Sequence, residues 1–404
     1  MLLLSLFFLP ESMSTGALKT AAVYICATRQ HIGKSSVCMG AVSGLKRRFR
    51  NVGFMKPVGQ RHEFVDGNRV DSDVCLIKEC FGLTDHYRNM SPVVIHPSYT
   101  RDLYAGSDYL NRLAEEKSRN QEKIVNAFEN IRKEKDFTVV EGTGHTGVGS
   151  VIGFSNAQVA AMLDIPMVVV ANGGFGRTFD ELHVAVEYAR SAGADVRGVI
   201  INKVQPSKRD EVKDFLETSF LQQMGLENMG IIPYGDLLDS PTMKDFEDLF
   251  KTKLLAGENH RFQHYKDIQI VATGLRRFIE KLGSGLYDNA AFVTHASRAD
   301  IVLGFISHSR VYEKRTGERF PGCLIVAGQD IGSAGGGNIT KEFPHVMSAI
   351  RLADAPVLYV ETTVYEVMKE INNNVSKLDA QDKKRNEAAI DLYESHINFD
   401  KLIR

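Results

Sequence analysis

The sequence predicts a doubly wound α/β domain with a mostly parallel sheet, followed by a second, smaller α/β domain. From Ala21 onward, short runs of Val, Ile and Ala alternate with amphipathic segments, which is the pattern of strands wrapped by helices. The apolar runs contain few polar residues, as is typical of strands buried on both faces. The pattern stops over a charged stretch and then restarts, and 404 residues are enough for two or three domains.

The first domain is expected to cover residues 20–243, after a disordered extension over 1–19. Its predicted strands are AAVYICA (21–27), NVGFMKPV (51–58), DFTVVEG (136–142), IPMVVVA (165–171), VRGVIIN (196–202) and MGIIPY (229–234). The segments with apolar residues at helical spacing are 35–49, 110–135, 179–194 and 209–225. Strands and helices therefore alternate along the whole domain.

The charged stretch at 244–266 is interpreted as a linker to a second domain at 267–404. There the strand pattern resumes with DIQIVATG, AAFVTHA, GCLIVAG and APVLYVE. The last segment, KKRNEAAIDLYESHI at 383–397, has helical spacing and is expected to pack back on this second domain. The run SAGGGN at 333–338 is expected to be flexible.

Composition excludes several classes of partner. With 49 Lys and Arg against 50 Asp and Glu, the formal net charge is −1, so nothing draws the whole protein to nucleic acid or to an anionic membrane. The apolar run at the amino terminus has no basic residue before it and is too short to span a bilayer. A charged ligand must therefore be bound locally.

The cysteines indicate a reducing compartment. There are five, an odd number, and none forms a Cys-x-x-Cys pair. This argues against a disulfide framework and against a structural zinc site. We expect the protein in the cytoplasm, with import into an organelle left open.

Residues 27–36, ATRQHIGKSS, have the form of a phosphate-binding loop between a strand and a helix. In such loops backbone N–H groups point at phosphates, a lysine reaches over the β and γ groups, and a hydroxyl binds Mg²⁺. The usual first glycine is replaced by Thr28, or by Ala27 if the loop is one residue longer. A Gly-Lys-Ser tripeptide also occurs by chance in such turns. The residues expected to bind nucleotide here are Ala27, Thr28, Gly33, Lys34, Ser35 and Ser36.

Two motifs after the loop offer charged side chains. Lys56 ends a predicted buried strand, at the sheet edge where ligands collect, and could neutralise a transferred phosphoryl group. The alternative is a surface lysine that caps the strand. Asp71 and Asp73, two residues apart before a helix, could reach a metal or a polar substrate. Such a pair is also a common helix N-cap signal.

An apolar strand delivers Glu141 at its carboxyl end, followed by four glycines within eight residues. An acid after a buried strand beside a phosphate loop is a candidate ligand for Mg²⁺ or water. The glycines let backbone N–H groups approach a ligand closely. We therefore expect a substrate-binding loop that contains Gly142, Gly144 and His145, although a lone histidine is often a hydrogen-bonded loop residue.

Later strand ends supply further candidates. Asn202 could read the adenine edge with its amide, which both donates and accepts hydrogen bonds, or could be a turn residue. Pro233 ends the last predicted strand of the domain. Arg177, after three glycines between strand and helix, is a candidate anion contact or a solvated arginine.

The order of these motifs resembles the dethiobiotin synthetase family of P-loop proteins. The order is phosphate loop, Lys-Pro-Val, Asp-x-Asp, Glu-Gly-x-Gly, Asn and Ile-Pro. The chain is most similar to the dethiobiotin-synthetase-like amino-terminal domain of long phosphotransacetylases, in its standalone form, where a DRTGG domain follows. The resemblance covers roughly residues 20–395 and implies a P-loop fold, ATP and Mg²⁺ as cofactors, and a homodimer.

The resemblance also implies roles for individual residues. Lys34 and Ser35 would bind phosphate and Mg²⁺, and Lys56 would assist the transferred phosphoryl group. Asp73 or Asp71 would hold Mg²⁺ together with Glu141. Asn202 and the backbone near Pro233 would seat adenine. Dethiobiotin synthetases phosphorylate a carbamate and close a ring.

The sequence departs from the family pattern in three places. The first loop glycine is missing. In the second domain, HASRADIV matches the DRTGG signature at Arg298 and Asp300 but has Ser297 in place of the preceding acid. The later glycine pair is represented by Gly328 and Gln329. Since 404 residues leave no room for an acetyl-transferring domain, the chain is not expected to be a phosphotransacetylase itself.

Two functions follow as hypotheses. The first is ATP-dependent phosphoryl transfer to a small carboxylate or carbamate acceptor, with catalysis by positioning and charge neutralisation. The second is a regulatory module that senses nucleotide without turning it over. Acceptor-dependent release of ADP would distinguish the first from the second.

Overall fold

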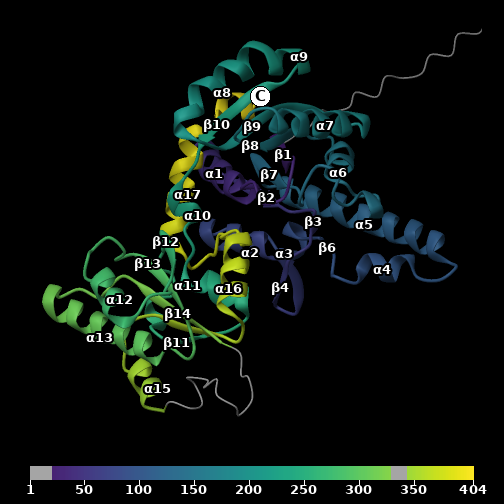
Figure 1. Ribbon diagram of the computed structural model, residues 1–404. Coiled ribbons are helices and arrows are strands. Elements are labelled where there is room, and N and C mark those ends of the chain that lie inside the picture. The colour runs from purple at the N-terminus through teal and green to yellow at the C-terminus, as the bar shows by residue number, and fades with distance from the viewer. Residues whose placement is uncertain (1–20, 329–343) are drawn as a thin grey trace, which may run out of the picture.

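A computed structural model describes residues 21–328 and 344–404 of the protein (Figure 1). The expected extension at 1–19, the flexible run at 333–338 and Gln329 lie outside the described residues. None of the described helices is long and apolar enough to cross a bilayer. The predicted α/β class is confirmed: two sheets, each covered by helices, form two bodies along the chain.

The first sheet has six parallel strands in the order β10-β9-β8-β1-β7-β2. All six predicted strands are present. Their apolar runs are buried on both faces of the sheet, as the scarcity of polar residues predicted. Their bounds are β1 (Ala21–Ala27), β2 (Val52–Met55), β7 (Phe137–Glu141), β8 (Met167–Asn172), β9 (Val196–Val204) and β10 (Glu227–Pro233). Because all strands run the same way, their carboxyl ends share one edge.

Helices cover this sheet in two groups. In the first group, α5 contacts α6 and α6 contacts α7. In the second group, α1 contacts α2. The bounds are α1 (Lys34–Lys46), α2 (Ser72–Phe81), α5 (Tyr109–Arg132), α6 (Asn156–Leu163) and α7 (Arg177–Ser191). The predicted helix at 209–225 is divided into α8 (Arg209–Phe215), a π-helical turn (Leu216–Phe220) and α9 (Leu221–Met224).

Short elements between β2 and α5 were not predicted. They are β3 (Val58–Gly59), β4 (His62–Val65), β5 (Asn68–Asp71), α3 (Tyr87–Met90), β6 (Val93–Val94) and α4 (Tyr99–Tyr104). β4 and β5 form a hairpin through Asp66 and Gly67, both at positive φ, which is the conformation that an Asp-Gly turn favours. The hairpin returns the chain so that α2 starts beside β3.

The second sheet has five strands in the order β11-β15-β14-β13-β12, and only β11 is antiparallel to its neighbour. α12, α13 and α15 supply one buried core and α11 and α16 the other, so the sheet is the middle of three layers. The bounds are α11 (Met243–Phe250), β11 (Leu254–Ala256), β12 (Asp267–Ile270), α12 (Leu275–Leu282), β13 (Ala290–His295), α13 (Ala299–Thr316), β14 (Cys323–Ala327), α15 (Pro344–Arg351), β15 (Val357–Val360) and α16 (Val364–Asn373).

The stretch interpreted as a linker is part of this second body. Met243, Phe246, Leu254 and Tyr265 are buried in the core between α11, α16 and the sheet. The interpretation of 244–266 as a linker is therefore wrong. Within α11, Met243 and Phe246 are directed into the core and Asp248 is exposed, whereas Glu247 is buried and pairs with Arg261 at 2.6 Å.

The carboxyl-terminal helix α17 (Lys383–His396) packs on the first body, so the prediction that it packs on the second is wrong. α17 lies along α1, and α18 (Phe399–Leu402) contacts β10 (Figure 1). The close approach depends on two glycines of α1, because a Cβ at Gly40 would overlap Tyr393 and one at Gly44 would overlap Phe399. Apolar helical spacing predicts that a face is buried, but not which body buries it.

Candidate functional site

The predicted phosphate loop joins β1 to α1 at the carboxyl edge of the first sheet. Gly33 is the N-cap of α1 with φ +85, in the left-handed region that glycine adopts at little cost. A Cβ there would also overlap the amide of Asn202. The first turn of α1 therefore presents its backbone N–H groups to the cavity, as required for binding a phosphate.

Asn202 holds the loop from below. It is completely buried, and its Nδ2 donates to the carbonyl of Ile32 at 2.6 Å and to the Tyr393 hydroxyl at 2.9 Å. Its Oδ1 accepts from the backbone N–H of Lys203 at 2.9 Å. Both Nδ2 hydrogens are thus donated within the protein, so the structure places Asn202 as a support under the loop, and its contact with adenine stays a prediction.

Lys56 lies among three carboxylates at the same edge. Its Nζ is 2.8 Å from Asp71 Oδ1 and 3.8 Å from Glu141 Oε1, and it donates a hydrogen bond to Asp73. Burial alone would lower the pKa of Lys56, but the carboxylates, Asp73 first, raise it above the usual value. Lys56 is therefore a buried, permanently charged group and not a surface cap.

The two aspartates have different positions. Asp71 is the N-cap of α2: its Oδ1 accepts from the N–H of Asp73 at 3.0 Å and its Oδ2 from that of Gln60 at 3.1 Å. The Asp73 side chain is 31% exposed and faces the cavity. Burial would raise the pKa of Asp73, but Lys56 reverses this and lowers it to about 2. Asp73 is thus ionised and accessible.

Glu141 ends β7 beneath the loop and is fully buried. Its Oε1 accepts from Ser35 Oγ at 3.0 Å and is 3.8 Å from Lys34 Nζ. Its Oε2 is buried without a hydrogen-bond partner in the described residues. Burial, with a further contribution from Asp73, raises the pKa of Glu141 to about 7. A buried oxygen without a partner is where a cation or an ordered water would be bound.

The glycine-rich loop after Glu141 is held by Asn156, the first residue of α6, which was not identified from the sequence. The Asn156 amide accepts from the N–H of Thr143 at 2.9 Å and donates to the carbonyls of Thr143 at 2.7 Å and His145 at 2.6 Å. The His145 ring is exposed and accepts from the N–H of Gly147 at 3.2 Å. A hydrogen bond within the loop agrees with the alternative that His145 is a hydrogen-bonded loop residue.

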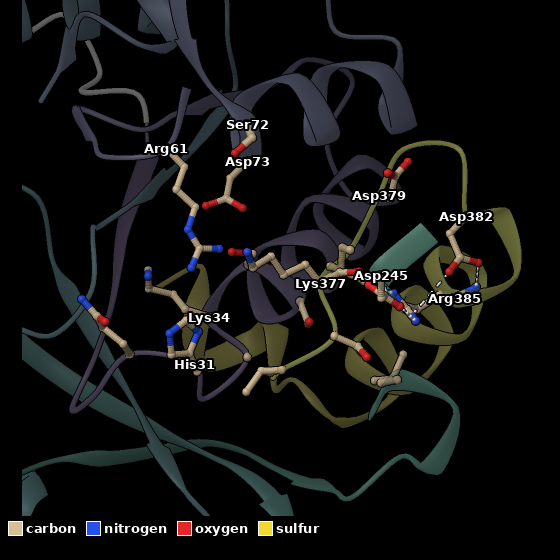
Figure 2. A pocket seen from close by; sticks show the side chains of 18 of the residues that line it. His31, Lys34, Arg61, Ser72, Asp73, Asp245, Lys377, Asp379, Asp382 and Arg385 are labelled. Atoms are coloured by element: carbon tan, nitrogen blue, oxygen red, sulfur yellow. Dashed lines mark hydrogen bonds and ion pairs between the residues drawn. The ribbon is translucent and has the colours of Figure 1, made fainter. Parts of the chain in front are cut away.

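A cavity of about 620 Å³ opens above these groups, between the first sheet edge and residues 374–385 (Figure 2). Of the predicted site residues, Gly33, Lys34, Ser35, Ser36, Lys56, Asp73 and Gly144 line it. Glu141 and Gly142 are buried directly below. Side chains that were not identified from the sequence also line it, among them Arg61, Lys377, Asp245, Asp382 and Arg385.

The other predicted residues do not line this cavity: Asn202 and His145, described above, and also Ala27, Thr28, Pro233 and Arg177. Ala27 is buried at the end of β1, and the lining of the loop begins after Thr28, at Arg29. Pro233 ends β10 away from the lining, so its adenine contact stays a prediction. Arg177 is 77% exposed and pairs with Glu181 at 2.7 Å, as a solvated arginine does.

In the second body, the segment that we compared with the DRTGG signature joins β13 to α13. Arg298 forms a two-point ion pair with Asp300, with both N···O distances at 2.9 Å, and also donates to the carbonyl of Thr273. Ser297 bonds the ring of His295 at 2.7 Å. The pair fixes the turn into α13.

Within residues 21–328 and 344–404, no group of three or more His, Cys, Asp and Glu side chains is arranged to hold a metal ion without other ligands. A P-loop site does not need such a group, because Mg²⁺ keeps waters and is bound through one or two protein oxygens plus substrate phosphates. Ser35, Asp73 and the unpartnered oxygen of Glu141 fit that arrangement.

Comparisons with known proteins agree with the motifs. A profile of the AAA_26 family (AAA domain) matches residues 21–242. The phosphate acetyltransferase of Nitratidesulfovibrio vulgaris is 24% identical over 389 residues, 94% of this chain and 51% of that protein. The ATP-dependent dethiobiotin synthetase BioD of Brachyspira hyodysenteriae is 30% identical over 239 residues, 57% of this chain and 99% of that protein. The chain thus spans about half the length of the acetyltransferase.

Among solved structures, the MinC:MinD cell division complex of Aquifex aeolicus is 15% identical with a TM-score of 0.34, covering 54% of this chain and 83% of that chain. An apo GTPase of Pyrococcus abyssi is 12% identical with a TM-score of 0.30, covering 51% and 77%. The family profile covers more than half of the chain and the synthetase is matched over nearly its whole length, so the chain belongs to the AAA_26 family of dethiobiotin-synthetase-like P-loop proteins.

Proposed function

We propose that the protein binds ATP with Mg²⁺ and transfers the γ-phosphoryl group to a small carboxylate or carbamate acceptor. The observation that carries the proposal is that Lys34, Lys56, Asp73 and Glu141, from four separate segments, meet beside the N-terminus of α1. Two cations and two carboxylates at this point are the groups that phosphoryl transfer needs.

The loop side would hold the nucleotide. The N–H groups of the first turn of α1 and the Lys34 ammonium would bind the β- and γ-phosphates. Ser35, Asp73 and Glu141 would hold Mg²⁺, which would neutralise charge on the phosphates. The Ser35 hydroxyl already donates to Glu141 at 3.0 Å, so these two ligands are positioned before any ligand binds.

The acceptor side supports a carboxylate or carbamate. Lys56 stays protonated, and the pKa of about 2 makes Asp73 a poor base. An acceptor that is already anionic needs no base to become a nucleophile, because carboxylates are ionised near neutral pH. Lys56 would neutralise the charge that develops on the transferred phosphoryl group, and Asp71 would keep its ammonium in place.

An assay that traps acyl phosphates tests the proposal. Wild-type protein, ATP, Mg²⁺ and a panel of carboxylic acids would be incubated with hydroxylamine, and ADP and hydroxamate measured together. We expect one class of acid to release both in equal amounts, and Lys56→Met to abolish both while MgATP still binds. ADP release that does not depend on an acid, or that is unchanged in Lys56→Met, would contradict the proposal.

One observation favours a second candidate, a nucleotide-sensing module. Tyr393 of α17 hydrogen-bonds Asn202 under the loop at 2.9 Å, so the carboxyl-terminal segment is in contact with the nucleotide site. Tight binding of MgATP without ADP release for any acid, together with weaker binding in Tyr393→Phe, would support the sensor. Acceptor-dependent turnover would exclude a purely sensing role.

The quaternary state and location are also part of the proposal. We propose a homodimer in a reducing compartment such as the cytoplasm, on the basis of the family resemblance and of five cysteines that are all free. Light scattering of the purified protein would measure the mass, and a value for one chain of 44.9 kDa would contradict the dimer.

A further inference from the structure

Three basic side chains at the cavity have no carboxylate partner among residues 21–328 and 344–404. His31 comes from the phosphate loop, Arg61 from the segment between β3 and β4, and Lys377 from the segment between α16 and α17. Figure 2 shows all three directed toward the same space, next to Lys34 and Asp73. No ion pair to these side chains is formed within the described part of the chain.

The other cations that line the cavity are neutralised. Lys203 pairs with Asp239 at 2.9 Å, Lys244 with Asp248 at 2.5 Å, and Arg385 with Asp245 at 2.8 Å. Arg29, Lys34 and Lys56 also have carboxylates within 4.0 Å. The absence of partners is therefore confined to one place in the cavity.

The basic side chains of this group affect one another's pKa values. Partial burial, followed by Arg61, Lys377 and Lys34, lowers the pKa of His31. Burial, followed by Arg61, lowers the pKa of Lys377. Like charges this close repel each other unless an anion lies between them.

Two lining carboxylates, Glu63 and Asp379, are also without ion-pair partners, but they do not face this group. Burial, followed by the charges of Asp379 and Asp71, raises the pKa of Glu63. Figure 2 shows Asp379 pointing away from Arg61. Asp73 also acts on Lys377, but it is already paired with Lys56, so Arg61 and Lys377 leave an excess of positive charge beside it.

The backbone on both sides of this space is fixed. The carbonyl of Arg61 accepts from the N–H of Ser72 at 3.1 Å, which places Arg61 beside Asp73. Buried Arg385 donates to the carbonyl of Lys377 at 2.5 Å and to that of Ser240 at 2.8 Å. Arg385 of α17 thus fixes the backbone at Lys377.

We propose that His31, Arg61 and Lys377 bind a second anionic group of the phosphoryl acceptor, so that the acceptor is a dianion. This inference rests on the proposed function: the group to be phosphorylated would lie at Lys56 and Asp73, and the second carboxylate or phosphate would lie between Arg61 and Lys377. Arginine binds either anion through two parallel N–H groups.

The test uses the full chain with MgADP present and compares acids as probes. Affinities for acetate, succinate and 3-phosphoglycerate would be measured by calorimetry at low salt. We expect at least one of the two acids that carry a second anionic group to bind at least about tenfold more tightly than acetate, and its binding to weaken at high salt. Succinate against 3-phosphoglycerate distinguishes a second carboxylate from a phosphate. Equal affinity for all three acids would overturn the proposal.

Variants locate the subsite. Arg61→Ala and Lys377→Ala should each weaken the preferred dianion about 10- to 100-fold, and Lys377→Arg should restore most of the affinity. Lys244→Ala is the matched control, because Lys244 lines the same cavity but is paired with Asp248. An equal loss in Lys244→Ala, or no loss in the first two variants, would overturn the assignment.

Binding of MgATP, measured separately, distinguishes this inference from the proposed function. We expect Arg61→Ala and Lys377→Ala to bind MgATP within about threefold of wild type, since Lys34 and α1 hold the phosphates. A loss of MgATP affinity as large as the loss for the dianion would assign the three cations to the nucleotide and overturn the acceptor subsite. Wild-type protein that binds the dianion but no MgATP would support the subsite and refute the phosphoryl-transfer function.

Discussion

The two sides of the cavity differ in how their charges are balanced. On the sheet side, Lys56 lies within 4.0 Å of Asp71, Asp73 and Glu141, so each of these charged side chains has an oppositely charged neighbour inside the protein. On the opposite side, Arg61 and Lys377 have no carboxylate partner among the described residues and are open to the cavity. The first arrangement has its charges paired in the free protein and keeps only the buried Oε2 of Glu141 open for a cation or water. For the second, we propose that the anion comes from a ligand.

This difference indicates a division of roles. A buried charge without a partner is unstable, so the paired cluster must form when the protein folds, and its geometry is set before any ligand arrives. Solvated cations cost little in the free protein and gain most when an anion binds. Chemistry is therefore expected on the paired side, and selection of the acceptor on the unpaired side.

The largest expected effect comes from removing the cation of the paired side. Lys56→Ala leaves Asp71 and Glu141 buried without their partner, which should lower the free energy of unfolding by about 3–5 kcal/mol. Urea denaturation would measure this. Lys244→Ala, which breaks a partly exposed pair at the same cavity, should change it by less than about 1 kcal/mol. Similar losses in the two variants would show that burial does not distinguish the two sides.

A smaller effect is expected from the pH dependence of Glu141. Its pKa is raised from 4.5 to about 7 in the folded protein, so between these values the native state keeps a proton that the unfolded state has released. The free energy of unfolding of the protein without ligands should therefore fall as pH rises from 4.5 to 7, by up to about 3 kcal/mol.

Glu141→Gln removes this titration. The difference in free energy of unfolding between variant and wild type, measured in urea at several pH values, should change across the same window and be constant above it. Parallel pH curves for the two proteins would refute a raised pKa for Glu141.

The smallest expected effect concerns the packing of α17 on α1, on which the position of Lys377 depends. Alanine is normally better than glycine inside a helix, but a Cβ at Gly40 would overlap Tyr393 and approach the N–H of Glu394 at 3.0 Å. Gly40→Ala should therefore destabilise the protein by about 1–3 kcal/mol in urea. Gly274→Ala, where a Cβ meets nothing within 4 Å, should have a smaller effect. A stabilising Gly40→Ala would contradict the packing of α17 on α1.

The paired side could be predicted from the sequence because its residues follow strands. Lys56 and Glu141 come at or just after the end of an apolar run, and Lys34 follows the loop after β1. The carboxyl ends of parallel strands share an edge. Asp71 and Asp73 were left open between cap and ligand, and the hydrogen bonds to Asp71 show which of the two caps the helix.

The unpaired side could not be predicted in this way. Lys377 lies more than 340 residues after Lys34, and its place depends on α17 returning to α1. The apolar spacing of α17 is compatible with packing on either body, and the choice is made by Gly40 and Gly44, which leave room for Tyr393 and Phe399. Such shape complementarity between distant segments has no periodic signal in a single sequence.

The same dependence on a distant segment explains why the sequence did not reveal the position of Asn202 under the loop. An asparagine at a strand end has free donors and acceptors in a sequence-based argument. In the structure they are used by Ile32, Tyr393 and the N–H of Lys203, one of which belongs to α17. Asn202 therefore supports the loop, and a distant helix supplies one of its hydrogen-bond partners.

Calorimetric titration of the protein with MgATP tests the central claim most directly, namely that the loop binds nucleotide although its first glycine is absent. We predict saturable binding to wild type, about 10- to 100-fold weaker binding to Lys34→Ala, and binding to the control Lys244→Ala that equals wild type. No binding to wild type, or equal binding to Lys34→Ala, would contradict the account.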